Sequence, residues 1–123
     1  MPHHIQDLEI HAGNDLVLPV TVTADGTSAG ERVDLTGTTK IVWAVSRRDV
    51  DGFIRLITKE LGDGITLTDS GEGVFEITLS ASETLNLHGP YLHEARVTDA
   101  DGHKSTVLSG NLTVHKTILT VNE

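Results

Sequence analysis

The stretch KIVWAVSR, residues 40–47, decides the fold class of this chain. Its apolar residues alternate with other residues, so Ile41, Trp43 and Val45 point to one side of an extended strand. Alternation of this kind predicts a β-strand with one buried face. Trp43 is the single tryptophan of the chain, and we expect it at the centre of the hydrophobic core.

The same alternation recurs on both sides of this stretch. The further runs are 15–23, 53–59, 74–79, 91–97 and 106–114. Dipeptides that favour tight reversals stand between or beside the runs: Asp25-Gly26, Asp51-Gly52, Asp63-Gly64 and Asp101-Gly102. The pattern predicts an all-β fold, an antiparallel β-sandwich of about seven to eight strands.

Two residues interrupt the predicted strands. Pro19 has no N–H to donate to a neighbouring strand, so its strand is expected at a sheet edge or with a bulge. Gly110 lies inside the run 106–114 and predicts a bulge or a close approach of another backbone. Alternation along this run places Leu108 inside and Val107 outside.

One segment has a helical pattern. Residues 80–87 predict a short helical turn, because Ser80 or Ser82 can cap it and Glu83 falls in its first turn. Gly89-Pro90 ends the segment. Tyr91 follows directly and is expected to bond its hydroxyl back to the preceding corner.

Length and composition narrow the class of protein. The chain has 123 residues, no cysteine and a formal net charge of -9, which predicts one domain without disulfides. A charge of this sign disfavours nucleic acid and membranes as partners. The predicted organisation is a flexible tail over residues 1–4, a sandwich over 5–115, and an extension over 116–123. That extension is expected either to prolong the last strand or to contact a neighbouring subunit.

The sequence contains only weak motifs for catalysis or metal binding. Asp99-Ala100-Asp101-Gly102 resembles the start of a calcium loop but lacks the remaining ligands, so a hairpin turn is the better interpretation. The seven histidines follow no metal-binding spacing, and His93 is expected on the inner face with its hydrogen bonds satisfied. We predict no catalytic residues, no metal and no cofactor, although a site of distant histidines stays open.

Several short motifs occur in an order that resembles a known group of domains. They are Gly13-Asn14-Asp15, Asp34-Leu35-Thr36-Gly37, the strand with Trp43, Gly64-Ile65-Thr66, Gly73-Val74-Phe75, the Leu79–Leu87 segment, Gly89-Pro90-Tyr91, Val97-Thr98-Asp99 and Ser109-Gly110-Asn111-Leu112-Thr113-Val114. Over residues 5 to 115 the chain resembles the immunoglobulin-like domains of phage and prophage tail proteins, similar to the N-terminal domain of siphophage upper baseplate proteins.

The resemblance implies an immunoglobulin-like sandwich that acts as a non-enzymatic virion structural protein in a tail, baseplate, neck or fibre. It would be made in the bacterial host cytoplasm and would contact other virion proteins, and a homo-oligomer is expected. The residues proposed for the interface are Val17, Val42, Val107, Ile118, Leu119 and Val121. The alternative function is a bacterial surface immunoglobulin-like module that binds carbohydrate or calcium.

Overall fold

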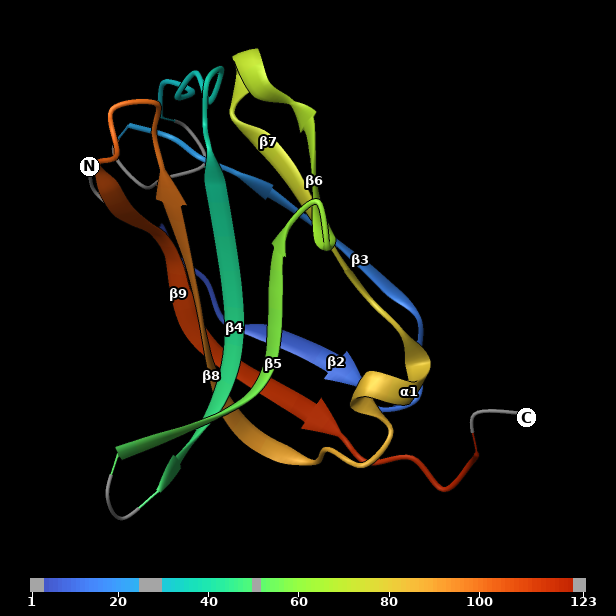
Figure 1. Ribbon diagram of the computed structural model, residues 1–123. Helices are drawn as coiled ribbons and strands as arrows, with labels where there is room; N and C mark the ends of the chain where they lie inside the picture. Colours follow the sequence, from blue (N-terminus) through green and yellow to red (C-terminus); the bar gives the residue numbers. More distant parts are fainter. Residues whose placement is uncertain (1–3, 25–29, 50–51, 121–123) are drawn as a thin grey trace.

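The computed structural model describes residues 4–24, 30–49 and 52–120, and almost all of its regular structure is β (Figure 1). The strands are β1 His4–Ile5, β2 Leu8–His11, β3 Leu16–Thr21, β4 Lys40–Asp49, β5 Gly52–Leu61, β6 Gly64–Asp69, β7 Val74–Leu79, β8 Gly89–Thr98 and β9 Lys104–His115. Two single helical turns accompany them, a 3-10 turn over Ser70–Glu72 and α1 over Ala81–Thr84. The predicted all-β fold is confirmed. Strand β1 begins at His4, inside the segment predicted as a tail.

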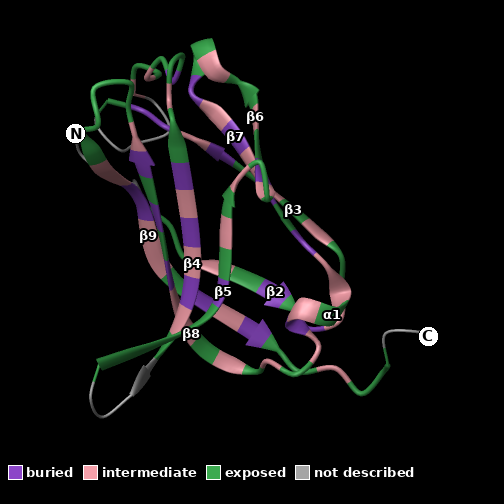
Figure 2. Cartoon of the chain, in the orientation of Figure 1, coloured by how far each residue is buried: buried purple, intermediate pink, exposed green. Residues whose placement is uncertain are grey.

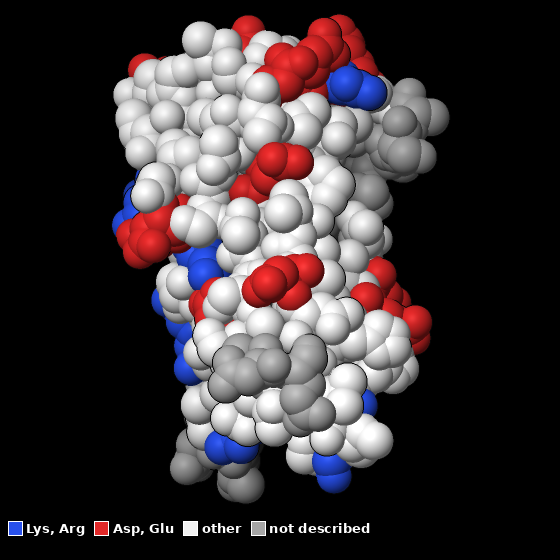
Figure 3. All heavy atoms as spheres, turned by 90° about the vertical axis from the view of Figure 1, so that its right-hand side faces the viewer, with Lys and Arg blue, Asp and Glu red and all other residues white. Residues whose placement is uncertain are grey.

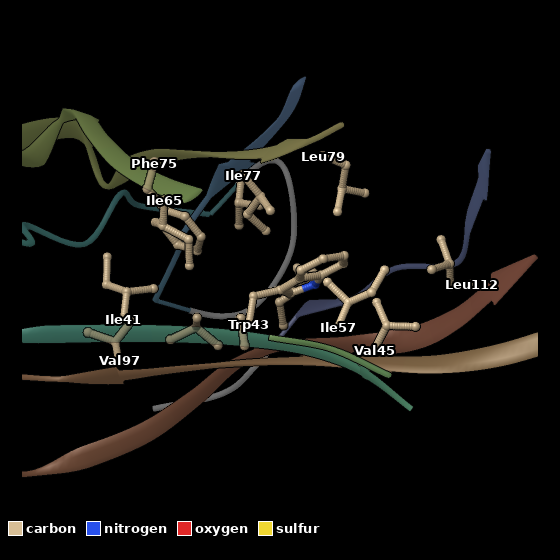
Figure 4. Close-up of a cluster of buried hydrophobic side chains, with 14 of the residues drawn as sticks. Ile41, Trp43, Val45, Ile57, Ile65, Phe75, Ile77, Leu79, Val97 and Leu112 are labelled. Atoms are coloured by element: carbon tan, nitrogen blue, oxygen red, sulfur yellow. The ribbon is translucent and has the colours of Figure 1, made fainter. Parts of the chain in front are cut away.

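The strands form one sheet that curls into two facing layers. Hydrogen bonds join them in the order β1-β9-β8-β4-β5-β6-β7-β3, and β2 also pairs with β9. In Figure 1, β9, β8, β4 and β5 stand on one side, and β6, β7 and β3 stand on the other. The apolar side chains of the two layers meet between them, which is the arrangement of a β-sandwich (Figure 4).

The predictions of tight reversals at the Asp-Gly dipeptides differ in outcome. Asp101-Gly102 lies in the loop between antiparallel β8 and β9, as predicted. Asp63-Gly64 does not reverse the chain between antiparallel strands, because β5 and β6 pair in parallel there through Glu60 with Gly64 and Leu61 with Ile65. At this corner the chain passes from one layer to the other. Asp25-Gly26 and Asp51 lie outside the described residues.

Parallel pairing at one edge is a feature that the sequence did not indicate. Strands β1 and β2 run parallel to β9, with His4 opposite Leu108 and Leu8 opposite Leu112. The first described residues are thereby fixed to the last strand of the sandwich.

The core forms around Trp43, as predicted. Its side chain is 0% exposed and lies opposite Phe75, Ile77 and Leu79 of the other layer (Figure 4). Buried residues alternate with intermediate ones along β4 and with exposed ones over residues 93–97 of β8, so one face of each strand is in the core and the other faces outward (Figure 2).

Three local predictions are confirmed. Pro19 lies on β3, which is the edge strand next to β7. Ser80 precedes α1, and its backbone N–H and Oγ both donate to Glu83 Oε1, at 2.9 and 3.0 Å. The Tyr91 hydroxyl donates to the carbonyl of His88 and accepts from its N–H, each at 3.1 Å.

Val107 is a correction, because its side chain is buried and only 2% exposed. The pairing of β8 with β9 shifts between Ala95 and Arg96, which face Leu108 and Thr106 and leave Val107 as an extra residue. This bulge breaks the period of two, so Val107 and Leu108 both enter the core. Val107 therefore offers no exposed interface.

Candidate docking surface

The outer face of the layer β5-β4-β8-β9 is the most distinctive surface of the described chain. Because Ile41, Trp43 and Val45 fill the core, Val42 and Ala44 of β4 point away from it. The register then sets the neighbours of these residues across the sheet. Val42 lies opposite Arg96 of β8, and Ala44 lies opposite Glu94.

Four cationic residues line a groove of about 250 Å³ on this face, and all four are exposed: Lys40, Arg55, Arg96 and Lys104. Lys40 and Lys104 are both opposite Thr98, from the two sides of β8. The four residues come from four different strands, so only the folded sheet brings them together. They are four of the nine Lys and Arg residues in the chain.

The groove has little negative charge of its own. Glu94 is the only carboxylate among its lining residues, and Glu94 Oε1 also accepts a hydrogen bond from Thr106 Oγ1 at 3.2 Å. Among the described residues, the Lys and Arg side chains in ion pairs are Arg32 and Lys59, which lie outside this groove. The sheet therefore places the four cations of the groove near one another, and none of them has an ion-pair partner among the described residues.

A second groove, of about 580 Å³, continues from the first and shares Ala44, Arg55 and Glu94 with it. Its lining includes two large apolar side chains that face solvent, Ile5 at 71% exposed and Phe53 at 63% exposed. Its other lining residues include Leu92, Ser46 and Asn111. The first groove is thus cationic, and the second, called the apolar groove below, exposes large apolar side chains beside polar ones that include Asp7.

A buried hydrogen-bonded chain lies below the apolar groove. Trp43 Nε1 donates to His93 Nδ1 at 3.2 Å, and His93 Nε2 is 2.7 Å from the carbonyl oxygen of Gln6. The neutral tautomer with its proton on Nε2 satisfies both contacts. Burial holds the pKa of His93 below 6.5, although the Gln6 carbonyl and the nearby Asp7 charge oppose this shift. The predicted satisfied inner-face histidine is confirmed.

Gly110 lets the first strands lie against β9. A Cβ at this position would overlap the carbonyl of Gln6, so the predicted close backbone approach is confirmed. Gln6 N–H donates to the Ser109 carbonyl at 2.8 Å, and Asn111 N–H donates to Asp7 Oδ1 at 3.0 Å. The edge of the apolar groove is therefore fixed by a backbone hydrogen bond and by one to the Asp7 carboxylate.

The loop between β8 and β9 holds Asp99, Asp101 and His103, whose possible ligand atoms lie within 4.8 Å of one another. Asp99 Oδ1 accepts the backbone N–H groups of Asp101 and His103, both at 2.9 Å. The His103 N–H in particular lowers the pKa of Asp99. These bonds are those of a hairpin turn, which accounts for the carboxylate without an ion.

The remaining interface candidates lie apart from one another. Val17 is 56% exposed on edge strand β3, whereas Val42 is half-buried and lines the cationic groove. Ile118 and Leu119 are 95% and 56% exposed and lie in a segment without strand structure. Val121 lies outside the described residues. Their role as interface residues stays a prediction.

Sequence reasoning did not find the cationic groove. Alternation along β4 and β8 places Lys40 and Arg96 on outward faces, and that signal was present. The pairing of β4 with β5 brings Arg55 close to them, and the pairing of β8 with β9 brings Lys104 close. Both pairings are properties of the folded sheet.

No helix in the described parts of the chain is long and apolar enough to span a membrane. No protein-family model and no curated protein matches the sequence. Similar solved structures include the fibronectin(III)-like modules of Clostridium thermocellum CbhA, with 13% identity, coverage of 95% of this chain and 93% of that chain, and a TM-score of 0.46. Murine CRIg has 12% identity, coverage of 89% and 92%, and a TM-score of 0.43. These likenesses assign no family to the chain.

Proposed function

We propose that this chain is a non-enzymatic assembly domain that docks onto another protein through the outer face of β5-β4-β8-β9. The observation that carries the proposal is the exposure of Ile5 and Phe53 in one groove, at 71% and 63%. Exposed apolar side chains gathered beside charged groups are typical of protein interaction sites, where docking removes them from water.

The setting that we propose is a phage or prophage virion, as a component of the tail, baseplate, neck or fibre. This part rests on the order of turn and strand motifs over residues 5–115. In that setting the domain is made in the host cytoplasm, contacts other virion proteins and forms a homo-oligomer.

Purified tailed particles from a host that carries the gene test this setting. An antibody against the chain, detected by immunogold electron microscopy, is expected to label one fixed position on the tail. Peptides of the chain are expected in the particle proteome at a constant ratio to the tail proteins. Particles that contain none of the chain would overturn the virion role.

A further inference from the structure

We infer that the outer groove binds an acidic protein segment that carries large apolar side chains at one end. The carboxylates of the segment would lie over Lys40, Arg96 and Lys104, and its apolar side chains would lie against Ile5 and Phe53. The choice of a protein as the occupant rests on the proposed function. The chemistry of the segment follows from the groove itself.

The charge of the groove supports an acidic occupant. The chain has twice as many acidic as basic residues, 18 against 9, so a random surface patch of this protein would be acidic. The groove instead gathers four cations around one carboxylate. An anionic partner would complement the charge of these cations.

The shape of the face supports a segment with separate acidic and apolar ends. The cationic and apolar grooves share Ala44, Arg55 and Glu94, so they form one continuous depression across β4 and β8. A segment lying in it meets cations first and apolar side chains second. The site therefore favours a segment whose acidic and apolar residues lie at separate ends over one in which they are mixed.

The pairing of the strands indicates how the segment is recognised. β4 is paired on both sides, with β5 and β8, and β8 is paired with β4 and β9. Their backbone groups are used in the sheet, which excludes recognition by strand addition at this face. Side chains must carry the recognition, so charge reversal of a single side chain is an informative test.

A short acidic segment fits this protein better than a long polyanion. Carboxylates are spread over the face shown in Figure 3, where most cationic atoms lie along the left-hand border and the lower end. A nucleic acid would extend past the groove, and the net charge of -9 would repel it. A short segment needs only the groove.

The test is an amide NMR titration of the ¹⁵N-labelled chain with a synthetic peptide of four glutamates followed by leucine and phenylalanine. Shifts are expected at the amides of Val42, Ala44 and Arg96. Binding should weaken at least about tenfold when salt screens the charges, between roughly 50 and 300 mM. A peptide of the same composition in which glutamates and apolar residues are mixed is expected to bind more weakly.

Two charge reversals provide the matched comparison. Arg96→Glu and Lys116→Glu change the net charge equally, but Lys116 does not line the groove. Arg96→Glu is expected to abolish the peptide shifts, and Lys116→Glu is expected to keep the affinity within about twofold, since screening limits its effect at a distance. The spectrum of each free variant reports whether it is folded.

Four results would overturn the inference: no shifts with the acidic peptide, equal loss in both variants, the same shifts with a single-stranded oligonucleotide, or self-association of the free chain through these residues. Presence of the chain in virions is measured separately. Failure of the groove to bind and failure of the virion role are therefore distinguishable.

Discussion

Ala95 and Arg96 are neighbours on β8, yet they lie on opposite faces of the same sheet. Ala95 is 0% exposed and packs in the core, whereas Arg96 is exposed and lines the cationic groove. On the inner face, no described buried side-chain polar atom lacks a hydrogen-bond partner. On the outer face, the four groove cations have no ion-pair partner among the described residues.

This difference indicates that the two faces have different roles. The inner face stabilises the fold through burial and satisfied hydrogen bonds. The outer face adds little stability and keeps charge and apolar surface exposed for a partner. Substitutions on the two faces should therefore separate stability from binding.

The largest effect is expected from Trp43→Ala. Removing the largest core side chain should lower the free energy of unfolding by about 3–5 kcal/mol, because a cavity replaces it and His93 Nδ1 loses its donor. Urea denaturation followed by circular dichroism measures this, since no other tryptophan is present. Phe53→Ala, at the exposed outer aromatic, should cost about 1 kcal/mol or less. Equal losses for the two would contradict the comparison.

A smaller effect is expected from Gly110→Ala. The added methyl meets the Gln6 backbone, and such overpacking typically costs about 1–3 kcal/mol. Hydrogen exchange at the Gln6 amide should accelerate, because its bond to Ser109 is displaced. Gly71→Ala is the control, since nothing lies within 4 Å of a Cβ at that position. If both variants behaved alike, the close approach would have no energetic role.

The next effect depends on pH and comes from His93. Its folded-state pKa is lowered from 6.5, chiefly by burial, so the unfolded chain takes up a proton more readily. The contribution of His93 to the free energy of unfolding should be fully present above pH 6.5. It should decrease by at most about 1.4 kcal/mol per pH unit as the pH falls below 6.5, and level off below the folded-state pKa.

His93→Gln isolates this contribution, because glutamine does not titrate and offers both an acceptor and a donor. Urea midpoints measured between about pH 7.5 and 5 should fall less steeply for the variant than for the natural chain, by the slope that one histidine supplies. Superimposable pH profiles would show that His93 does not couple protonation to folding.

Much of the inner face could be predicted from the sequence. Alternation identified Trp43 and its strand, and the local chemistry of proline, serine and tyrosine identified the edge strand, the helical turn and the corner at Tyr91. These features depend on residues close in sequence. The prediction for Val107 was wrong because a bulge inserts one residue, and alternation alone gives no sign of a bulge that lacks a glycine at the site.

The groove could not be predicted in the same way. Lys40, Arg55, Arg96 and Lys104 are up to 64 positions apart, and their proximity depends on which strands pair and in which register. The parallel addition of β1 and β2 to β9, which brings Ile5 to this face, likewise depends on pairing between the two ends of the described chain.

The smallest effect is also the most direct test of the separation between the two faces. The measurement is the free energy of unfolding of Arg96→Glu beside that of Ala95→Leu, under the same buffer and salt. Ala95→Leu should lose about 1–3 kcal/mol by overpacking the core, and Arg96→Glu should stay within about 0.5 kcal/mol of the natural chain. If Arg96→Glu cost as much as Ala95→Leu, the outer face would be part of the stabilising structure and not a surface kept for a partner.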